Sequence, residues 1–594
     1  MRARLPALLA LAVLPLAGFV GYGCGTQPVS FFTDGGADGN PDDAQVVDDS
    51  PFLPLDDGGS EASTCGSKCS SDLHTVLDCN DNPVTTCTGT DGCDPKSGTC
   101  INACAAATAN KQSVGCDYYA TFMEIYGGAS RCFVAFVANT WNSPAKINVE
   151  LNGATLPIAN FARIPQGSGS AITYAAYNAQ TGLPPGEVAI LFLGGSTGPS
   201  PACPIASATG ATAMLAGTGK GNSFRVTTDV PVVAYEMNPY GGGNAAVTGA
   251  SLLLPVSAWD TNYIASTASP QTAAPPSINI IAAEDNTQIT LLPKVAVTGG
   301  GGIPGGAANT QIKFSLNKGQ QAQIVQQADL VGSVVQSSAP IGLMAGNPCM
   351  NMPQGVTYCD HGEQMVPPVR ALGSEYVSVM YRQRGGEPAI WRLVGAVDGT
   401  TLSYTPSTPV GAPLTINQGQ MVEFDTATPF VVKSQDDKHP FLMFEYMAGA
   451  SYSKLSAQGT GDPDFAVVVP PQQYMSSYVF MTDPTMPETN LVIVRKKDGK
   501  GNFQDVTLDC GGKLTGWAPV GDYEWTRRDL STGNFQSVNG CSNGRHDIKS
   551  AAPFGLWIWG WGTPATGTGY VSYAYPGGMN VQPINNVIIP PTPK

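Results

Sequence analysis

The sequence predicts an all-β protein built from tandem repeated units, and three observations support this prediction. Gly and Pro number 70 and 48 among 594 residues, which is typical of a chain with many turns. Charged residues make up 13% of the chain, about half of the usual share, so the residues that favour exposed helices are scarce. Runs rich in Val, Ile, Thr and Tyr recur between the turns, as expected for short strands.

The first element, residues 1–23, has the pattern of a signal peptide. A short basic start precedes an apolar stretch from Leu5 to Val20, shorter than the roughly 20 apolar residues of a membrane-spanning helix. Cys24 stands where a bacterial lipoprotein carries its lipidated cysteine, and Gly25 rather than Asp follows it. We therefore predict a lipid anchor on Cys24 and a location at the outer membrane or cell surface. An ordinary secreted protein is the alternative.

Residues 24–63 are predicted to form an acidic, disordered tether. After Cys24 the segment contains nine Asp or Glu and no Lys or Arg, so it carries −9 of the formal net charge of −15. Such a composition cannot offset the entropy that ordering would cost. The acidic balance of the whole chain also argues against a nucleic-acid partner, because phosphate binding requires a basic surface.

Residues 64–116 are predicted to form a small module held by four disulfides. Eight cysteines fall in this segment, an even number, and disulfides are expected in an exported protein. A zinc site is the alternative, but the cysteines lack the paired spacing of zinc ligands. Their spacing leaves the connectivity open. The eight residues are Cys65, Cys69, Cys79, Cys87, Cys93, Cys100, Cys104 and Cys116.

The rest of the chain contains four copies of one pattern. A tight-turn dipeptide lies between strand-like runs at Asn152-Gly153, Asp285-Asn286, Asp398-Gly399 and Asp498-Gly499. A Gly followed by an acid or amide ends at Glu187, Gln320, Gln420 and Asp522. A Pro opens an apolar strand at Pro231, Pro340, Pro440 and Pro553. At three boundaries a Pro also precedes a strand-starting Tyr by eight residues: Pro255/Tyr263, Pro368/Tyr376 and Pro470/Tyr478.

These signals divide the body into units 117–254, 255–367, 368–469 and 470–583, followed by a C-terminal tail, 584–594. Short strands with turns between them suggest that each unit is a β-sandwich of about a hundred residues. A closed β-propeller-like array is the alternative. The remaining six cysteines fall within units, and proximity pairs them as Cys132–Cys203, Cys349–Cys359 and Cys510–Cys541.

Several runs resemble the N-terminal domain of IgG-Fc-binding proteins, which is found in a mucin-associated animal protein and in bacterial surface proteins. They are RCFVAFVANTW from Arg131, INVELNG, PVVAYEMNP, GASLLLPVSAWDTNYIAS and INIIAAEDNTQITL. The resemblance covers about 130–450, and the repeats extend it to about 583. The von Willebrand-type domains of the animal protein are missing, and the resemblance supplies no catalytic residues. It implies a binding protein, without carrying IgG binding over to this chain.

No catalytic, cofactor or metal site is predicted. The run Gly194 to Gly198 matches G-x-S-x-G, but the Pro-rich sequence after it cannot form the helix that a hydrolase nucleophile needs. His361, His439 and His546 fall in different units without metal-binding spacing. These observations predict that the protein is not an enzyme.

A ligand site is predicted on the last apolar strand. Trp557, Trp559 and Trp561 alternate, so their rings share one face and could form a platform for sugar rings. The alternative is a buried core position, which the apolar residues at equivalent positions of the other units favour.

The sequence therefore predicts a lipid-anchored binding or adhesion protein of the cell surface that recognises an extracellular protein or glycan. Two alternatives remain open at this point. One is a structural envelope or matrix protein without a specific small ligand, and the other is a secreted hydrolase.

Overall fold

The structure is a computed structural model that describes residues 67–198, 202–268 and 274–593. The predicted signal peptide, the tether, Cys24 and Cys65 lie outside these residues. About 46% of the chain is strand and 5% is helix, so the prediction of an all-β protein is confirmed. Residues from Thr64 to the C-terminus form one compact unit.

In its described residues, 67–116, the cysteine-rich module contains short strands, one α-helix and three disulfides. The disulfides join Cys69 to Cys93, Cys87 to Cys100, and Cys104 to Cys116. The exposed Cys79 is bonded to no cysteine in the described part of the chain. The elements are β1 (Lys68–Cys69), β2 (Thr75–Leu77), β3 (Pro83–Thr86), β4 (Asp91–Asp94), β5 (Thr99–Asn102) and α1 (Ala103–Asn110).

The module packs on the first repeated unit. The His74 ring stacks on Trp141 with ring centroids 4.1 Å apart. The indole Nε1–H of Trp141 donates a hydrogen bond of 2.9 Å to the carbonyl of Gly89. These contacts bury Trp141 and fix the module against the sheets that follow.

Most strands of the first two units form one sheet each, but β13, which lies in the first unit, pairs with β20 in the second sheet. The nine-stranded first sheet contains β6 (Gly115–Ala120), β7 (Phe133–Asn139), β8 (Ile147–Leu151), β9 (Ala154–Thr155), β10 (Ala162–Gln166), β11 (Thr173–Ala176), β12 (Val188–Gly194), β14 (Phe224–Met237) and β15 (Ala250–Leu252). The eight-stranded second sheet contains β13 (Gly219–Asn222), β16 (Asp260–Ile264), β17 (Ser277–Ala282), β18 (Thr287–Leu292), β19 (Ile312–Leu316), β20 (Gln320–Val325), β21 (Val334–Met350) and β22 (Asp360–Met365).

The third unit forms two four-stranded sheets and the fourth unit one nine-stranded sheet. The third unit contains β23 (Glu375–Ser378), β24 (Ala389–Gly395), β25 (Thr400–Thr405), β26 (Thr415–Ile416), β27 (Met421–Thr426), β28 (Phe430–Ser434), β29 (Phe441–Tyr446) and β30 (Phe465–Val467). The fourth contains β31 (Met475–Met481), β32 (Glu488–Lys496), β33 (Val506–Leu508), β34 (Gly512–Lys513), β35 (Ala518–Val520), β36 (Tyr523–Thr532), β37 (Gln536–Ser537), β38 (Arg545–Trp561) and β39 (Ser572–Pro576).

The prolines that recur in the sequence mark the place where a long strand changes partners. In β14 the residues before Pro231 pair with β8 and those after it pair with β7. In β21 the residues before Pro340 pair with β18 and those after it with β17. In the third unit the strand is divided into β28 and β29, with Pro440 between them. Because proline has no N–H, it fits where the hydrogen-bond ladder is interrupted.

A buried tyrosine makes the same hydrogen bond at the bend of the long strand in each unit. The buried hydroxyls of Tyr118, Tyr263 and Tyr376 each donate to the carbonyl of the residue just after the recurring proline, at 2.6, 2.6 and 2.5 Å. Tyr478 makes the same contact with Phe554. The Pro–Tyr spacing therefore has a physical cause: the tyrosine ties the start of one unit to the bend of its long strand.

One of the four turn signals was assigned to the wrong place in the repeat. Asp285-Asn286, Asp398-Gly399 and Asp498-Gly499 follow the equivalent strands β17, β24 and β32, whereas Asn152-Gly153 connects β8 to β9. The equivalent connection in the first unit is residues 140–146, between β7 and β8. The physical reason is that Asn-Gly favours any tight hairpin with positive φ, whatever its position in the topology.

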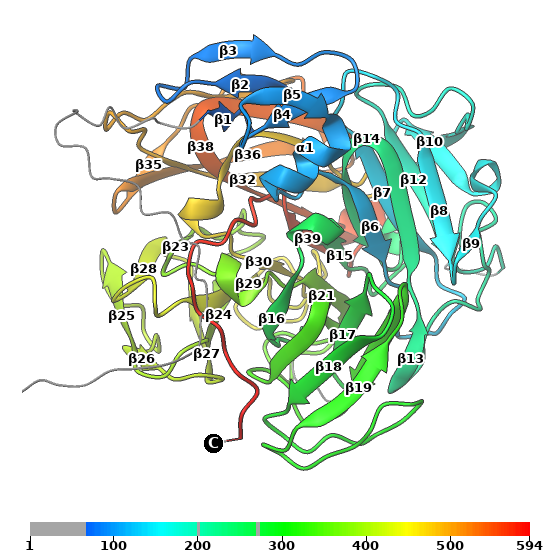
Figure 1. Cartoon of the computed structure of the whole chain (residues 1–594), viewed down its shortest axis with the longest axis vertical. Helices are drawn as coiled ribbons and strands as arrows, with labels where there is room; N and C mark the ends of the chain where they lie inside the picture. The colour runs from blue at the N-terminus through cyan, green and yellow to red at the C-terminus, as the bar shows by residue number, and fades with distance from the viewer. Residues whose placement is uncertain (1–66, 199–201, 269–273, 594) are drawn as a thin grey trace, which may run out of the picture. The chain divides into compact units, whose positions relative to one another are not determined.

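The four units meet at four inner strands. Strand β15 contacts β22 and β39, and β30 contacts the same two strands, so the contacts form a closed circuit. Figure 1 shows β15, β30 and β39 close together, between the sheets that carry the long strands. The Gln364 side chain on β22 links β22 to β15 and β39, since its Nε2–H group donates to the carbonyls of Ala250 and Ala574 at 2.8 and 2.9 Å. The sandwich-like units are thus joined along their inner strands, and their buried apolar residues form two large clusters that each span more than one unit.

The predicted C-terminal tail runs along the second and third units. The amide of Asn585 donates to the carbonyls of Val369 and Leu372 at 2.8 and 2.9 Å. The backbone N–H of Ile589 donates to Asn262 Oδ1 at 2.8 Å. The segment therefore adds a tie between neighbouring units.

Disulfides join Cys132 to Cys203, Cys349 to Cys359 and Cys510 to Cys541, as their proximity in the sequence predicted.

Candidate functional site

A pocket of about 580 Å³ opens where the inner strands begin. Its lining includes Val247, Cys359, Asp462 and Tyr570, which lie within three residues of the starts of β15, β22, β30 and β39. Every unit therefore contributes to it, and we call it the axial pocket. The closed circuit of inner strands creates the pocket, because it brings these four segments to one place.

Three exposed tyrosines surround the axial pocket. Tyr126, Tyr358 and Tyr570 are 57%, 54% and 41% exposed, and they are the only large aromatic residues this exposed in the described part of the chain. The rings of Tyr358 and Tyr570 lie 4.6 Å apart. Exposed aromatic rings gathered at one pocket are typical of a binding surface, whereas single exposed apolar residues are ordinary.

The backbone holds two of these tyrosines in an uncommon conformation. Tyr358 and Tyr570 have φ angles of 67° and 65°, in the left-handed region that bulky residues rarely adopt. The Cys349–Cys359 disulfide closes the loop that carries Tyr358. Strained backbone persists only where the surrounding structure enforces it, and such residues concentrate at functional sites.

Asp462 supplies a carboxyl group to the lining of the pocket. Its Oδ1 accepts the backbone N–H of Ala450 at 2.8 Å, and its Oδ2 has no hydrogen-bond partner among the described residues. Burial raises the pKa of Asp462 to about 7, against the opposing effects of the Ala450 N–H and the Arg384 charge. The group therefore changes its charge near neutral pH.

Four further carboxyl groups are buried at the centre. Burial raises the pKa of each well above its ordinary value, and repulsion between neighbouring carboxyl groups adds to this for three of them. Each also has one oxygen without a hydrogen-bond partner in the described structure. We therefore expect these groups to be protonated at neutral pH. The four are Glu236, Asp360, Glu363 and Asp464.

His361 lies among these acids and is neutral. Its Nε2 is 3.3 Å from Glu363 Oε2 and 3.4 Å from the amide nitrogen of Asn238. Burial lowers the pKa of His361 to about 3. The contact with Glu363 is therefore a hydrogen bond between neutral groups rather than an ion pair. Asp360 and His361 begin β22, and both are buried.

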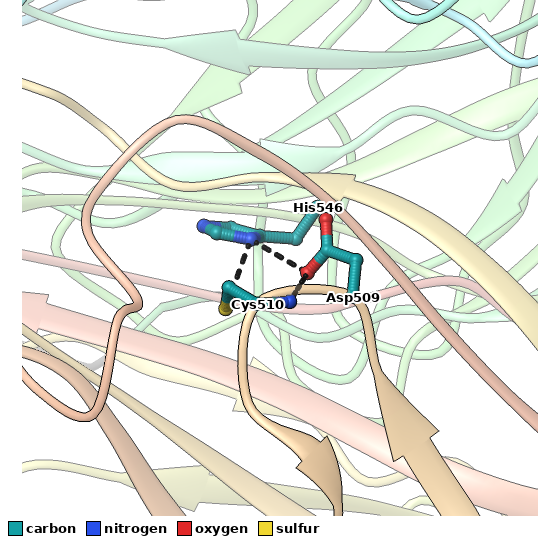
Figure 2. A group of neighbouring side chains, drawn as sticks. All are labelled: Asp509, Cys510 and His546. Carbon is teal, nitrogen blue, oxygen red and sulfur yellow. Dashed lines mark hydrogen bonds and ion pairs between the residues drawn. The ribbon is translucent and has the colours of Figure 1, made fainter.

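A second cluster of polar residues, on the fourth unit, does not have the chemistry of a metal site. Figure 2 shows the side chains of Asp509, Cys510 and His546 close together. The Cys510 sulfur is bonded to Cys541, so it cannot bind a metal as a thiolate. His546 Nδ1 lies 3.0 Å from Asp509 Oδ1, and its Nε2 lies 2.7 Å from the Ser542 carbonyl. Both ring nitrogens thus have protein partners that fix the loop.

The predicted sugar platform is contradicted by burial. Trp557, Trp559 and Trp561 do share one face, but they are 3%, 0% and 1% exposed. Trp557 Nε1–H donates to the carbonyl of Val467 at 2.9 Å, and Trp559 packs 4.9 Å from the Tyr381 ring. The third unit covers these indoles, so they belong to the core between two units.

Sequence reasoning did not identify any residue of the axial pocket as a ligand-binding candidate. Tyr126, Tyr358 and Tyr570 are single aromatic residues in Gly- or Thr-containing loops, such as GTGY and GVTYC. Asp462 lies in a Gly- and Asp-rich loop. A lone aromatic residue among turn residues gives only a weak signal of exposure, and nothing in the sequence places these loops together.

Comparisons with known proteins identify relatives for more than half of the chain. A family model described as IgGFc binding protein matches residues 249–560. The human IgGFc-binding protein is 25% identical over 340 residues, which are 56% of this chain and 6% of the human protein. The chain thus spans a small fraction of that relative's length. No helix in the described residues is long and apolar enough to cross a membrane.

Proposed function

This chain belongs to the IgGFc binding protein family, and from that premise we propose that it is a non-catalytic binding protein of the cell surface. It is exported, held at the outer membrane by a lipid on Cys24, and recognises an extracellular protein or glycan. The family membership supports binding as the general activity. The anchor and the class of ligand are parts of the proposal.

The axial pocket carries this proposal. It combines three exposed tyrosine rings, a carboxyl group with a free oxygen, and a backbone held by strained residues and a disulfide. Aromatic rings supply contact area at a small entropy cost, which is why they dominate binding sites. A rigid loop lowers the cost of ordering on binding. These features favour a binding site over a purely structural role.

The N-terminal segment would present this site away from the membrane. The residues between Cys24 and residue 64 are acidic and rich in Gly and Pro, and fully extended they span at most roughly 130 Å. The same sequence would let the compact unit reach partners beyond the lipid headgroups.

A binding screen tests the function. We expect the purified protein to bind at least one component of an extracellular protein and glycan array that includes IgG Fc. Replacing both Tyr358 and Tyr570 with Ala should weaken that binding at least tenfold, because the paired rings supply the contact surface. Val410→Ala is the control, since Val410 is 92% exposed on a loop that does not line the pocket.

Two results of this screen would contradict the proposal. Binding that survives the double tyrosine variant would remove the axial pocket as the site. No binding to any component would favour an envelope or matrix protein without a specific ligand. Turnover of polysaccharide or ester substrates would instead revive the hydrolase alternative.

Mass spectrometry of the mature protein tests the anchor and the fourth disulfide of the module. We expect a fatty-acylated Cys24 at the N-terminus and a peptide pair linking Cys65 to Cys79. The six disulfides of the structure leave only these three cysteines of the fifteen unassigned. An unmodified Cys24, or free thiols at the other two positions in the non-reduced protein, would contradict these expectations.

A further inference from the structure

The side chains that line the axial pocket include an acidic group and no basic group. Among the described residues that line it there is no Lys, Arg or His, and Asp462 is the charged side chain. An anionic ligand would therefore enter a pocket with no cation to receive it. A ligand that carries positive charge would find both a carboxyl oxygen and the faces of three tyrosines.

Two arginines near this region are hydrogen-bonded to the backbone, and one of them, Arg131, donates to Ala246 of the pocket lining. Arg384 donates to the carbonyls of Thr460 and Ala448 at 2.8 and 2.6 Å and pairs with Glu387. Arg131 Nη1 donates to the backbone carbonyls of Ala245 and Ala246. Neither guanidinium forms an ion pair with Asp462. Asp462 thus forms no ion pair in the described structure, although the charge of Arg384 still acts on its carboxyl group and lowers its pKa.

The aromatic lining favours the same kind of ligand. A cation over the face of a tyrosine is attracted by the negative charge of the ring face, and this attraction is strongest in partly desolvated sites. Tyr358 and Tyr570, 4.6 Å apart and tilted by 45°, form two walls of different orientation. Tyr126 adds a third ring at the same pocket.

The side-chain partners that the pocket offers to a neutral sugar are mainly the tyrosine hydroxyls and Asp462, because two other polar side chains are already hydrogen-bonded. Thr357 Oγ1 is hydrogen-bonded to Ser451 Oγ at 2.8 Å, and the Asn351 amide donates to the Tyr358 carbonyl at 2.6 Å. Sugar hydroxyls that enter a pocket without partners lose their hydrogen bonds to water. The N–H groups of a cationic side chain can pair with the one carboxyl group while the cation lies over the aromatic faces, which are what the pocket supplies.

From these contacts we infer that the axial pocket binds the ammonium or guanidinium group of a Lys or Arg side chain presented by a protein partner. This inference rests on the proposed binding function and specifies its ligand. The net charge of −15 for the whole chain would also steer a basic partner toward the protein.

The inference predicts a pH dependence with a definite sign. The ligand binds the ionised form of Asp462, whose pKa of about 7 means that acidification protonates it. Binding therefore strengthens as the pH rises from 5.5 to 8. Of the neighbouring groups, His361 stays neutral across this interval, because burial lowers its pKa to about 3. The buried acids Asp360 and Asp464, whose pKa values are raised, also contribute to the electrostatics of the pocket.

The test uses the full chain and biotinylated Gly/Ser peptides that carry one Lys, one Arg or one acetyl-lysine, immobilised for biolayer interferometry. We expect the Lys and Arg peptides to bind at least tenfold more tightly than the acetyl-lysine peptide at pH 8. This preference should fall about tenfold at pH 5.5. Asp462→Asn should abolish the preference at pH 8, and Tyr358→Phe, which keeps the ring face, should retain it.

The outcomes separate this inference from the proposed function. Equal binding of Lys and acetyl-lysine peptides by the wild-type protein would overturn the inference, as would a preference that Asp462→Asn leaves intact. Tighter binding of chitosan, a polymer of cationic sugars, than of the Lys peptides would overturn the choice of a protein partner. Binding of a neutral array component that depends on Tyr358 and Tyr570 would leave the proposed function standing while the inference fails.

Discussion

The free energy of unfolding is expected to fall as the pH rises from about 4 to about 7. The cause is the group of carboxyl side chains buried at the centre, whose pKa values are raised by burial in the folded protein. For Asp462, the change from an ordinary 3.8 to about 7 corresponds to on the order of 4 kcal/mol. Asp483, with a pKa raised to about 6, adds roughly 3 kcal/mol.

The sign follows from proton binding. Below pH 4 both the folded and the unfolded chain keep these protons. Above it the unfolded chain releases them while the folded chain retains them, so the unfolded state gains stability until the buried groups ionise. His361 acts in the opposite direction, because its pKa is lowered to about 3 and folding excludes its proton below pH 6.5. Because His361 is one group and the buried acids are several, the acids determine the direction in which the free energy of unfolding changes with pH.

Urea denaturation between pH 4 and pH 8 measures this effect, and Glu236→Gln isolates part of it. Gln is neutral at every pH and its oxygen can still accept the Thr121 N–H, which Glu236 accepts at 2.8 Å. The variant should be more stable than the wild-type protein at pH 8 and equal to it at pH 4. Glu187→Gln, at an exposed position, should change neither value. Wild-type stability that rises across this interval, with Glu236→Gln destabilised at pH 8, would contradict the prediction.

Replacing Trp557 with Ala should destabilise the protein by about 3–5 kcal/mol, the usual cost of removing a large buried aromatic side chain. The ring is 3% exposed, its Nε1–H donates to Val467, and Tyr474 packs against it at right angles. The substitution leaves a cavity between the third and fourth units and an unpaired carbonyl. Thermal and urea unfolding measure the loss.

Trp517→Ala is the matched control. Trp517 is only half-buried and stacks on the Arg495 guanidinium at 3.9 Å, so its removal should cost much less. Glycan binding of the Trp557→Ala variant, measured well below its melting temperature, should equal that of the wild-type protein. A variant that melts normally but loses glycan binding would restore the sugar platform.

Local signals in the sequence predicted much of the fold because their causes are local. Pro231 and its counterparts lack the N–H that a continuous ladder needs, so they mark the bend of each long strand wherever it lies. Tyr263, Tyr376 and Tyr478 recur at a fixed distance from a proline because each hydroxyl must reach one carbonyl. The Asn152-Gly153 turn was misplaced because turn chemistry specifies a hairpin and not its partner strands.

The pocket residues could not be predicted in the same way. Tyr126, Tyr358, Tyr570 and Asp462 are separated by up to 444 positions and come from loops of different units. The sequence also could not decide whether the indole rings of the fourth unit face solvent or another unit, since alternation predicts a shared face and not what covers it.

By itself the sequence determined the class of strands and turns, the fourfold repeat and the family, because these depend on short-range backbone preferences and on recurring spacing. Only the tertiary structure decided that the inner strands close a circuit, that the indoles are buried and that three tyrosines and a carboxyl group meet in one pocket. The physical reason is that the burial of a side chain and its pKa depend on contacts between units. Those contacts join segments that lie far apart in the sequence, and their distance in space cannot be inferred from their separation along the chain.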